Sequence, residues 1–127
     1  MSTILIIDDH EVVAESLAYL LNGEGFDTLV TRSGREGLEA IENHQPDLVI
    51  CDYAMPGMTG LDVLKVLREH PRLSKTPFIM LTMFRDLDES AKKAGADAFL
   101  SKTNGLDSLL TTVYDLVNKK KDNGATA

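Results

Sequence analysis

Four apolar runs of this chain each end on polar side chains that could act together in one chemical step. Asp8 and Asp9 follow the first run, Asp52 the second, Thr82 the third and Lys102 the fourth. Carboxylates that lie close together raise one another's pKa, so three of them need a cation to remain ionised. Mg²⁺ prefers oxygen ligands and often binds through one or two carboxylates and phosphate oxygens. An oxygen nucleophile, a metal and a lysine cation are the components that phosphoryl transfer requires.

Each of these residues alone has an ordinary explanation. Adjacent aspartates after a strand are commonly solvated loop residues, and Asp52 alone would serve as a cap of the following turn. Lys102 alone is most often a surface lysine, and Thr82 alone a strand-end hydroxyl. His10 could join the aspartates in a transition-metal site, but a loop or helix-start role is the preferred interpretation. The hypothesis of a metal and phosphoryl site depends on the chain bringing these residues together.

Short apolar runs predict the strands that would do so. Three runs are almost purely apolar, which is typical of strands covered on both faces of a parallel sheet. A fourth run alternates, which favours an edge strand, and a fifth is shorter. The predicted strands are Ile4–Ile7, Phe26–Val30, Leu48–Cys51, Phe78–Leu81 and Ala98–Leu100.

Helical periodicity fills the segments between these runs. Ser33 with Glu36, and Thr59 with Asp62, have the spacing of capping boxes that begin helices. Glycines or prolines follow several of the periodic segments and predict where they end. The apolar positions predict helices over Val13–Leu21, from Ser33 through Ile41, over Leu61–Leu67, over Leu87–Ala94 before Gly95, and over Leu106–Val117 with Asn104 as its cap.

Strict alternation of strands and helices predicts a doubly wound α/β fold. We expect a (βα)₅ arrangement with right-handed crossovers, five parallel strands and helices on both faces of the sheet. Asp8, Asp9 and Asp52 can converge only if the first and third strands are neighbours. The strand order 2-1-3-4-5 of a flavodoxin-like fold gives this adjacency, and it places a topological switch point beside the carboxylates.

Length and composition limit the class of protein. The 127 residues fit one domain, which we expect to span residues 1–121, followed by a disordered tail over residues 122–127. The net charge of −7 argues against direct nucleic-acid binding by this domain. No apolar run approaches the roughly 20 residues of a membrane helix. The start of the chain has no secretory pattern, and the single Cys51 favours a reducing, cytoplasmic location.

Four sequence motifs in order carry a family resemblance. They are IIDDH at Ile6–His10, VICDYAMPGMTG at Val49–Gly60, MLT at Met80–Thr82 and AGADAFLSK at Ala94–Lys102. With them the chain resembles the receiver domain of two-component response regulators over about residues 3–120. Each motif alone is a weak signal, but all four in the same order and register are specific.

The resemblance implies a metal and phosphoacceptor site. Asp52 corresponds to the phosphoacceptor, Asp9 to a direct Mg²⁺ ligand and Asp8 to a ligand that acts partly through water. Asp52 and the backbone carbonyl of Ala54 would complete the protein ligands, and Mn²⁺ would substitute for Mg²⁺. The Ala54 side chain is therefore free to vary in this family.

The resemblance also implies roles in phosphoryl binding and switching. Lys102 would pair with phosphoryl oxygens, Thr82 would donate a hydrogen bond to one of them, and Phe99 occupies the aromatic switch position. Three further residues would shape the loop after the phosphoacceptor: Pro56, Gly57 and Gly60.

A function in a phosphorelay follows from the resemblance. A sensor histidine kinase or histidine phosphotransfer protein would donate the phosphoryl group, and the output face would change shape. The recipient would be a downstream effector protein or an attached output domain, and the resemblance allows a homodimer on phosphorylation. Such a domain catalyses its own phosphorylation and slow autodephosphorylation but is not an enzyme with an independent substrate. No membrane partner is expected.

Two positions depart from the family pattern. The family usually has proline after the lysine, in a cis peptide, whereas Thr103 follows Lys102 here. A small residue usually follows the switch threonine, whereas Met83 follows Thr82, and its bulk would slow both phosphorylation and hydrolysis. The Asp-Asp-His start and the missing proline are more similar to receivers attached to helix-turn-helix effectors of the nitrate-regulator type.

Two other classes of protein share parts of the pattern. A metal-dependent phosphohydrolase with an aspartate nucleophile usually has a D-x-D pair after the first strand and a cap, whereas this chain has adjacent Asp8 and Asp9. A receiver-like binding module that is never phosphorylated is the second alternative. The intact Asp52, Thr82 and Lys102 argue against it.

Overall fold

The described chain is a five-stranded sheet with four helices around it. The computed structural model describes residues 2–82, 92, 94–102 and 106–125. Its elements are β1 (Thr3–Ile7), α1 (Glu11–Gly23), β2 (Asp27–Thr31), α2 (Gly34–His44), β3 (Leu48–Asp52), α3 (Gly60–Arg68), β4 (Phe78–Thr82), β5 (Ala98–Ser101) and α5 (Leu106–Ala125).

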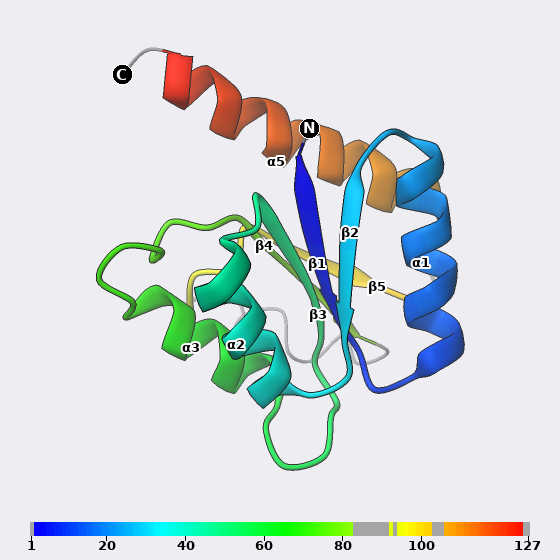
Figure 1. Cartoon of the computed structure of the whole chain (residues 1–127), viewed down its shortest axis with the longest axis vertical. Coiled ribbons are helices and arrows are strands. Elements are labelled where there is room, and N and C mark those ends of the chain that lie inside the picture. Colours follow the sequence, from blue (N-terminus) through cyan, green and yellow to red (C-terminus); the bar gives the residue numbers. More distant parts are fainter. Residues whose placement is uncertain (1, 83–91, 93, 103–105, 126–127) are drawn as a thin grey trace.

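The sheet has the predicted topology. All four neighbouring strand pairs are parallel, and the order is β2-β1-β3-β4-β5. Helices α2 and α3 lie on one face of the sheet, and α1 and α5 lie on the other (Figure 1). The prediction of a flavodoxin-like doubly wound fold is therefore confirmed, and β1 and β3, which precede the carboxylates, are neighbours.

Two separate apolar cores arise from the alternation of side chains along each strand. In β1, Ile4 and Ile6 pack with the buried residues of α1 and α5, whereas Leu5 and Ile7 pack with those of α2 and α3. Strands β3 and β4 divide in the same way, and all their residues are buried. Burial on both faces explains why these strands are continuous apolar runs in the sequence.

Polar caps fix where the helices begin. Thr59 and Asp62 form the predicted capping box of α3, in which each side chain accepts the other residue's backbone N–H. At the start of α2, Ser33 accepts the N–H of Glu36. Such caps satisfy amide groups that have no partner within the helix, and each contributes about 1 kcal/mol.

The last helix is longer than the sequence predicted. Helix α5 runs to Ala125, so the prediction of a disordered tail from Asp122 is wrong as far as Ala125. A helix that has already formed extends at little further cost, because each added residue needs no new nucleation. The predicted helix over Leu87–Ala94 lies outside the described residues except for Lys92 and Ala94. The predicted cap Asn104 also lies outside them.

Within the described part of the chain, no helix has the length and hydropathy to span a membrane.

Arg68 links two loops through hydrogen bonds at the amino ends of the strands. Its guanidinium donates to the carbonyl oxygens of Thr76 and Gly95, at 2.6 and 3.0 Å, and to Asp97 Oδ2 at 3.0 Å. Asp97 Oδ2 also accepts the N–H of Phe78 at 2.8 Å, and the Asp97 N–H donates to the carbonyl of Phe78. The start of β5 is thereby fixed to the start of β4.

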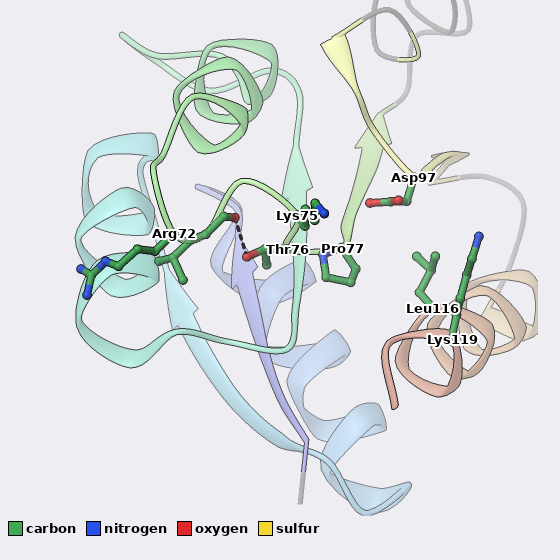
Figure 2. A pocket seen from close by; sticks show the side chains of 8 residues that line it. Arg72, Lys75, Thr76, Pro77, Asp97, Leu116 and Lys119 are labelled. Carbon is green, nitrogen blue, oxygen red and sulfur yellow. Dashed lines mark hydrogen bonds between the residues drawn. The ribbon is translucent and has the colours of Figure 1, made fainter. Parts of the chain in front are cut away.

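A groove of about 340 Å³ lies at this same end of the sheet. Figure 2 shows Leu116 and Lys119 of α5 on one side and Pro77 and Lys75 on the other, with Asp97 above them. These residues precede β4 and β5 or lie on α5, so the groove lies away from the carboxyl ends of the strands. It therefore does not include the predicted site residues.

Close packing at Gly60 generates a prediction about stability. A Cβ atom at position 60 would lie 2.5 Å from the Asp52 carbonyl oxygen and 2.7 Å from Met80 Sδ. We expect Gly60→Ala to lower the free energy of unfolding by about 1–3 kcal/mol, because backbone atoms must move. Urea denaturation of the purified domain measures this loss.

The control is Gly23→Ala at the end of α1, where an added Cβ meets nothing within 4 Å. It should leave the free energy of unfolding unchanged or raise it by up to about 1 kcal/mol, because alanine reduces the conformational freedom of the unfolded chain. Equal stability of the two variants would contradict the close approach at Gly60.

Candidate metal site at the carboxyl edge of the sheet

Backbone hydrogen bonds continue past the strand ends and hold the polar residues in place. The N–H of Asp8 donates to the carbonyl of Thr31 at 3.0 Å. The N–H of Lys102 donates to the carbonyl of Thr82 at 2.9 Å, and that of Tyr53, next to Asp52, donates to the Leu81 carbonyl at 3.0 Å. The functional side chains thus start from backbone that belongs to the sheet.

Lys102 bridges two buried carboxylates. Its Nζ lies 3.2 Å from Asp8 Oδ2 and 3.1 Å from Asp52 Oδ1. Asp8 is 1% exposed and Asp52 is 4% exposed, so both charges are largely removed from water. The side chains come from the ends of β1, β3 and β5, and the structure brings them together at one edge as the sequence predicted.

Burial and charge shift the titration of this group. Desolvation and then the negative charge of Asp8 raise the pKa of Asp52, and Lys102 only partly offsets them. Burial by itself lowers the pKa of Lys102, but the charges of Asp52 and Asp8 outweigh it and raise that pKa overall. The lysine therefore remains an ammonium ion, and it only partly offsets the repulsion between Asp8 and Asp52.

The carboxylate oxygens fit a divalent cation. Asp9 Oδ1 and Asp52 Oδ2 are buried and have no hydrogen-bond partner. Together with ligand atoms of Asp8 and His10 they lie within 4.8 Å of one another. Unpaired carboxylate oxygens around a shared point are the donor set that Mg²⁺ prefers.

The position of His10 fits both interpretations that the sequence left open, a helix-start role and a role in the metal site. It is the residue that precedes α1, as a helix-start role requires, yet its side chain makes no cap hydrogen bond. Its Nδ1 atom lies 3.2 Å from Asp8 Oδ1 and 3.3 Å from Asp9 Oδ1. The ring therefore lies among the carboxylates.

The loop after Asp52 turns sharply at Gly57. Gly57 has a φ of 81°, in the left-handed region that favours glycine, and the N–H of Met58 donates back to the Pro56 carbonyl at 2.9 Å. The Gly60 N–H then donates to the Tyr53 carbonyl at 2.9 Å and closes the loop. Ala54 is exposed in this loop. Metal binding by its carbonyl stays a prediction.

The two predicted switch residues lie on adjacent strands. Thr82 is buried at the end of β4. Phe99 is half-buried in β5 and packs against the core on the α2 and α3 face. Their roles in switching stay predictions. Met83 and Thr103, where the sequence departs from the family pattern, lie outside the described residues.

Two neighbours of the site bear on its chemistry. Cys51 is buried, and burial followed by the charges of Asp52 and Asp8 raises the pKa of its thiol, which keeps it unreactive. A hollow of about 320 Å³ beside Lys102, between α1 and α5, was not predicted. The sequence signal for it was Val12, an apolar residue next to the predicted helix over Val13–Leu21, which lines the hollow and is exposed.

The fold and the site together define a class of protein. It is an α/β domain of flavodoxin-like topology with an acidic, metal-type site at its topological switch point. The family model of the response regulator receiver domain matches residues 4–114. The chain therefore belongs to the response regulator receiver domain family and is a signalling switch of two-component systems.

Two relatives illustrate the similarity in sequence. The chain is 37% identical over 124 residues to the DNA-binding response regulator MtrA of Mycolicibacterium smegmatis, covering 96% of this chain and 53% of MtrA. It is 30% identical over 113 residues to the polar-differentiation response regulator DivK of Brucella ovis, covering 87% of this chain and 92% of DivK. The chain thus spans about half the length of the MtrA relatives and nearly all of DivK.

A solved structure shows the same fold. The response regulator TrrA of Thermotoga maritima, in complex with Mg²⁺ and BeF, matches with a TM-score of 0.84 at 30% identity. The match covers 91% of this chain and 99% of TrrA.

The raised pKa of Asp52 generates a prediction about pH and stability. Its folded-state pKa lies above the unfolded value, so ionisation of Asp52 destabilises the fold. The loss of stability is absent at pH values below the pKa of Asp52 in the unfolded chain and complete at pH values above its pKa in the folded protein. In EDTA at pH 7, Asp52→Asn should raise the melting temperature by roughly 2–8 °C, the shift that about 1 kcal/mol produces in domains of this size.

The gain should shrink as the pH falls through the raised pKa of Asp52 toward the unfolded value. Asp115→Asn, which removes an exposed charge on α5, is the matched control and should change little. A gain at Asp52 that is independent of pH would show that ionisation of this carboxyl is not its cause.

Proposed function

We propose that this domain accepts a phosphoryl group on Asp52 from the phosphohistidine of a sensor kinase or phosphotransfer protein, in a reaction that requires Mg²⁺. One observation carries the proposal. The buried Asp52 carboxylate has one oxygen paired with Lys102 and the other without a hydrogen-bond partner, within an acidic cluster that suits a divalent cation.

The chemistry follows from the atoms present. An Asp52 carboxylate oxygen attacks phosphorus, the bond from phosphorus to the donor's histidine nitrogen breaks, and the released histidine is neutral or takes up a proton from solvent. Lys102 pairs with phosphoryl oxygens, and the Thr82 hydroxyl donates to one of them. Asp8, Asp9, Asp52 and the Ala54 carbonyl hold Mg²⁺, or Mn²⁺ in its place. When bound, the metal neutralises charge on the carboxylates and the transferring group.

Both a relative and the sequence support this assignment over a phosphohydrolase. TrrA, a structural match, was solved with Mg²⁺ and BeF. We infer the same kind of site here. A D-x-D pair starting at Asp8 would need aspartate at position 10, where this chain has His10.

Signal output is part of the proposal. Thr82 is drawn toward the phosphoryl group, and Phe99 on the neighbouring strand moves into the space that Thr82 leaves. The altered face then binds a downstream effector or an attached output domain, or it pairs with a second copy. MtrA is a DNA-binding response regulator, but the net charge of −7 on this chain favours DNA contact outside this domain. The phosphohistidine donors of this proposal and the free Cys51 thiol are in keeping with the cytoplasm.

The direct test is phosphorylation by a small donor. With acetyl phosphate and Mg²⁺, intact-mass spectrometry should show one added phosphoryl group, and Asp52→Asn should reduce it to background. EDTA should have the same effect, because the carboxylates then lack their cation. Asp115→Asn on α5 should be phosphorylated like the parent domain. Full phosphorylation in EDTA, or an adduct mapped to another residue, would refute the assignment.

Lys102 should couple the phosphoryl group to the switch. The beryllofluoride mimic with Mg²⁺ should shift the amide resonances of Thr82 and Phe99 in the parent domain. In Lys102→Ala the mimic should still bind, but the Phe99 shift should fall by about half or more, because the cation that links the ligand to β5 is missing. Lys75→Ala, at the opposite end of the sheet, is the control. An unchanged Phe99 response in Lys102→Ala would remove Lys102 from the coupling.

A further inference from the structure

We propose that His10 supplies a nitrogen ligand to the metal site, which raises the affinity of this receiver for first-row transition ions such as Mn²⁺, Co²⁺ and Zn²⁺ relative to its affinity for Mg²⁺. The inference rests on the proposed function of Asp8, Asp9 and Asp52 as metal ligands. It adds a fourth protein side chain and a selectivity that the oxygen ligands alone do not provide.

Two of the separations from the His10 ring match the edges of a coordination polyhedron. His10 Nδ1 lies 3.2 Å from Asp8 Oδ1, 3.3 Å from Asp9 Oδ1 and 3.8 Å from Asp52 Oδ2. Two ligands of a tetrahedral ion, each bound at about 2.0–2.1 Å, lie about 3.3 Å apart. The ring nitrogen and the oxygens of Asp8 and Asp9 are therefore spaced as ligands of one ion, and the Asp52 oxygen lies farther from the ring.

The unpaired oxygens point to the same place. The two buried acceptors without a hydrogen-bond partner in this cluster are Asp9 Oδ1 and Asp52 Oδ2, the very atoms that lie nearest His10 Nδ1 on those residues. Asp52 is only 4% exposed, so water has little access to its carboxylate. A cation between these atoms would satisfy both oxygens and the ring nitrogen at once.

Apart from a hydrogen bond between its Nδ1 and Asp8 Oδ1 at 3.2 Å, nothing in the described fold requires an imidazole at position 10. The residue precedes α1, but its side chain makes no cap hydrogen bond. Its backbone N–H donates to Asp8 Oδ1 at 2.9 Å, and any residue except proline can make that bond. The side chain is 62% exposed, so burial in the core does not hold it there either.

Ligand chemistry sets the expected selectivity. Imidazole nitrogen suits Mn²⁺, Co²⁺ and Zn²⁺, and affinity for nitrogen and oxygen sites rises from Mn²⁺ through Co²⁺ to the later ions. Mg²⁺ prefers oxygen ligands and keeps several waters, so it gains little from a nitrogen donor. Removing His10 should therefore weaken binding of transition ions much more than binding of Mg²⁺.

A protonated ring that merely neutralises the carboxylates is the rival explanation. A positive imidazolium beside Asp8 and Asp9 would compete with every metal ion for the same oxygens. Removing it would strengthen the binding of all divalent ions. The two explanations thus predict changes of opposite sign for the same substitution.

The test is a set of metal titrations on the whole chain. Isothermal titration calorimetry with MgCl₂, MnCl₂ and CoCl₂ at neutral pH compares the parent protein with His10→Ala and His10→Gln. We expect both variants to lose about tenfold or more in affinity for Co²⁺ and Mn²⁺, and less than about threefold for Mg²⁺. The visible absorption of bound Co²⁺ should also change, because its intensity and position depend on the ligand set. His44→Ala, at the end of α2, is the control for loss of a histidine far from the site.

The outcomes separate this inference from the proposed function. An equal loss for all three ions, no loss, or a gain in affinity would each overturn the nitrogen ligand. Circular dichroism of each variant establishes that the fold is retained. Asp9→Ala tests the site itself. If Asp9→Ala leaves Mg²⁺ binding intact, the proposed metal site fails. If Asp9→Ala weakens Mg²⁺ binding but His10→Ala keeps the parent's ratio of Co²⁺ affinity to Mg²⁺ affinity, only the role of His10 is overturned.

Discussion

Two buried carboxylates that share a single ammonium group govern the carboxyl edge of this sheet. Asp8 and Asp52 come from neighbouring strands, and Lys102 reaches both of them from beyond β5. Burial favours neutral groups, so this arrangement is tolerated only because the ammonium ion is close. One cation does not balance two buried carboxylates together with Asp9. The remaining negative charge suits this edge to a divalent cation, which is the basis of the metal site that we propose.

The sequence was sufficient to predict the sheet and the place where its polar residues meet. Strands buried on both faces leave continuous apolar runs, and the strict alternation with helices allows few topologies. Parallel strands end at the same edge, so residues such as Asp8 and Asp52 that directly follow strands converge without any knowledge of distances. The capping box of Thr59 was visible for a similar reason, since its spacing is local.

Distances across the fold could not be predicted from local spacing. Nothing in the sequence shows that Lys102 contacts two carboxylates, or that Gly60 lies too close to the Asp52 carbonyl for any side chain. The ring of His10 had two interpretations because its orientation depends on where α1 starts relative to β3. The continuation of α5 past Asp122 was missed because the polar residues of a solvated helix end resemble those of a loop.

The contacts of Arg68 have a mechanical consequence at the other end of the sheet. Asp97 and Phe78 bind each other through two hydrogen bonds, and the guanidinium holds Asp97, so β5 is anchored at its first residues. At its far end β5 is held as well, because it pairs with β4 as far as Ser101 and the Lys102 N–H donates to the Thr82 carbonyl. The strand is thus clamped to β4 at both ends. The backbone of Lys102 can therefore shift only together with the end of β4, whereas the start of β5 stays fixed.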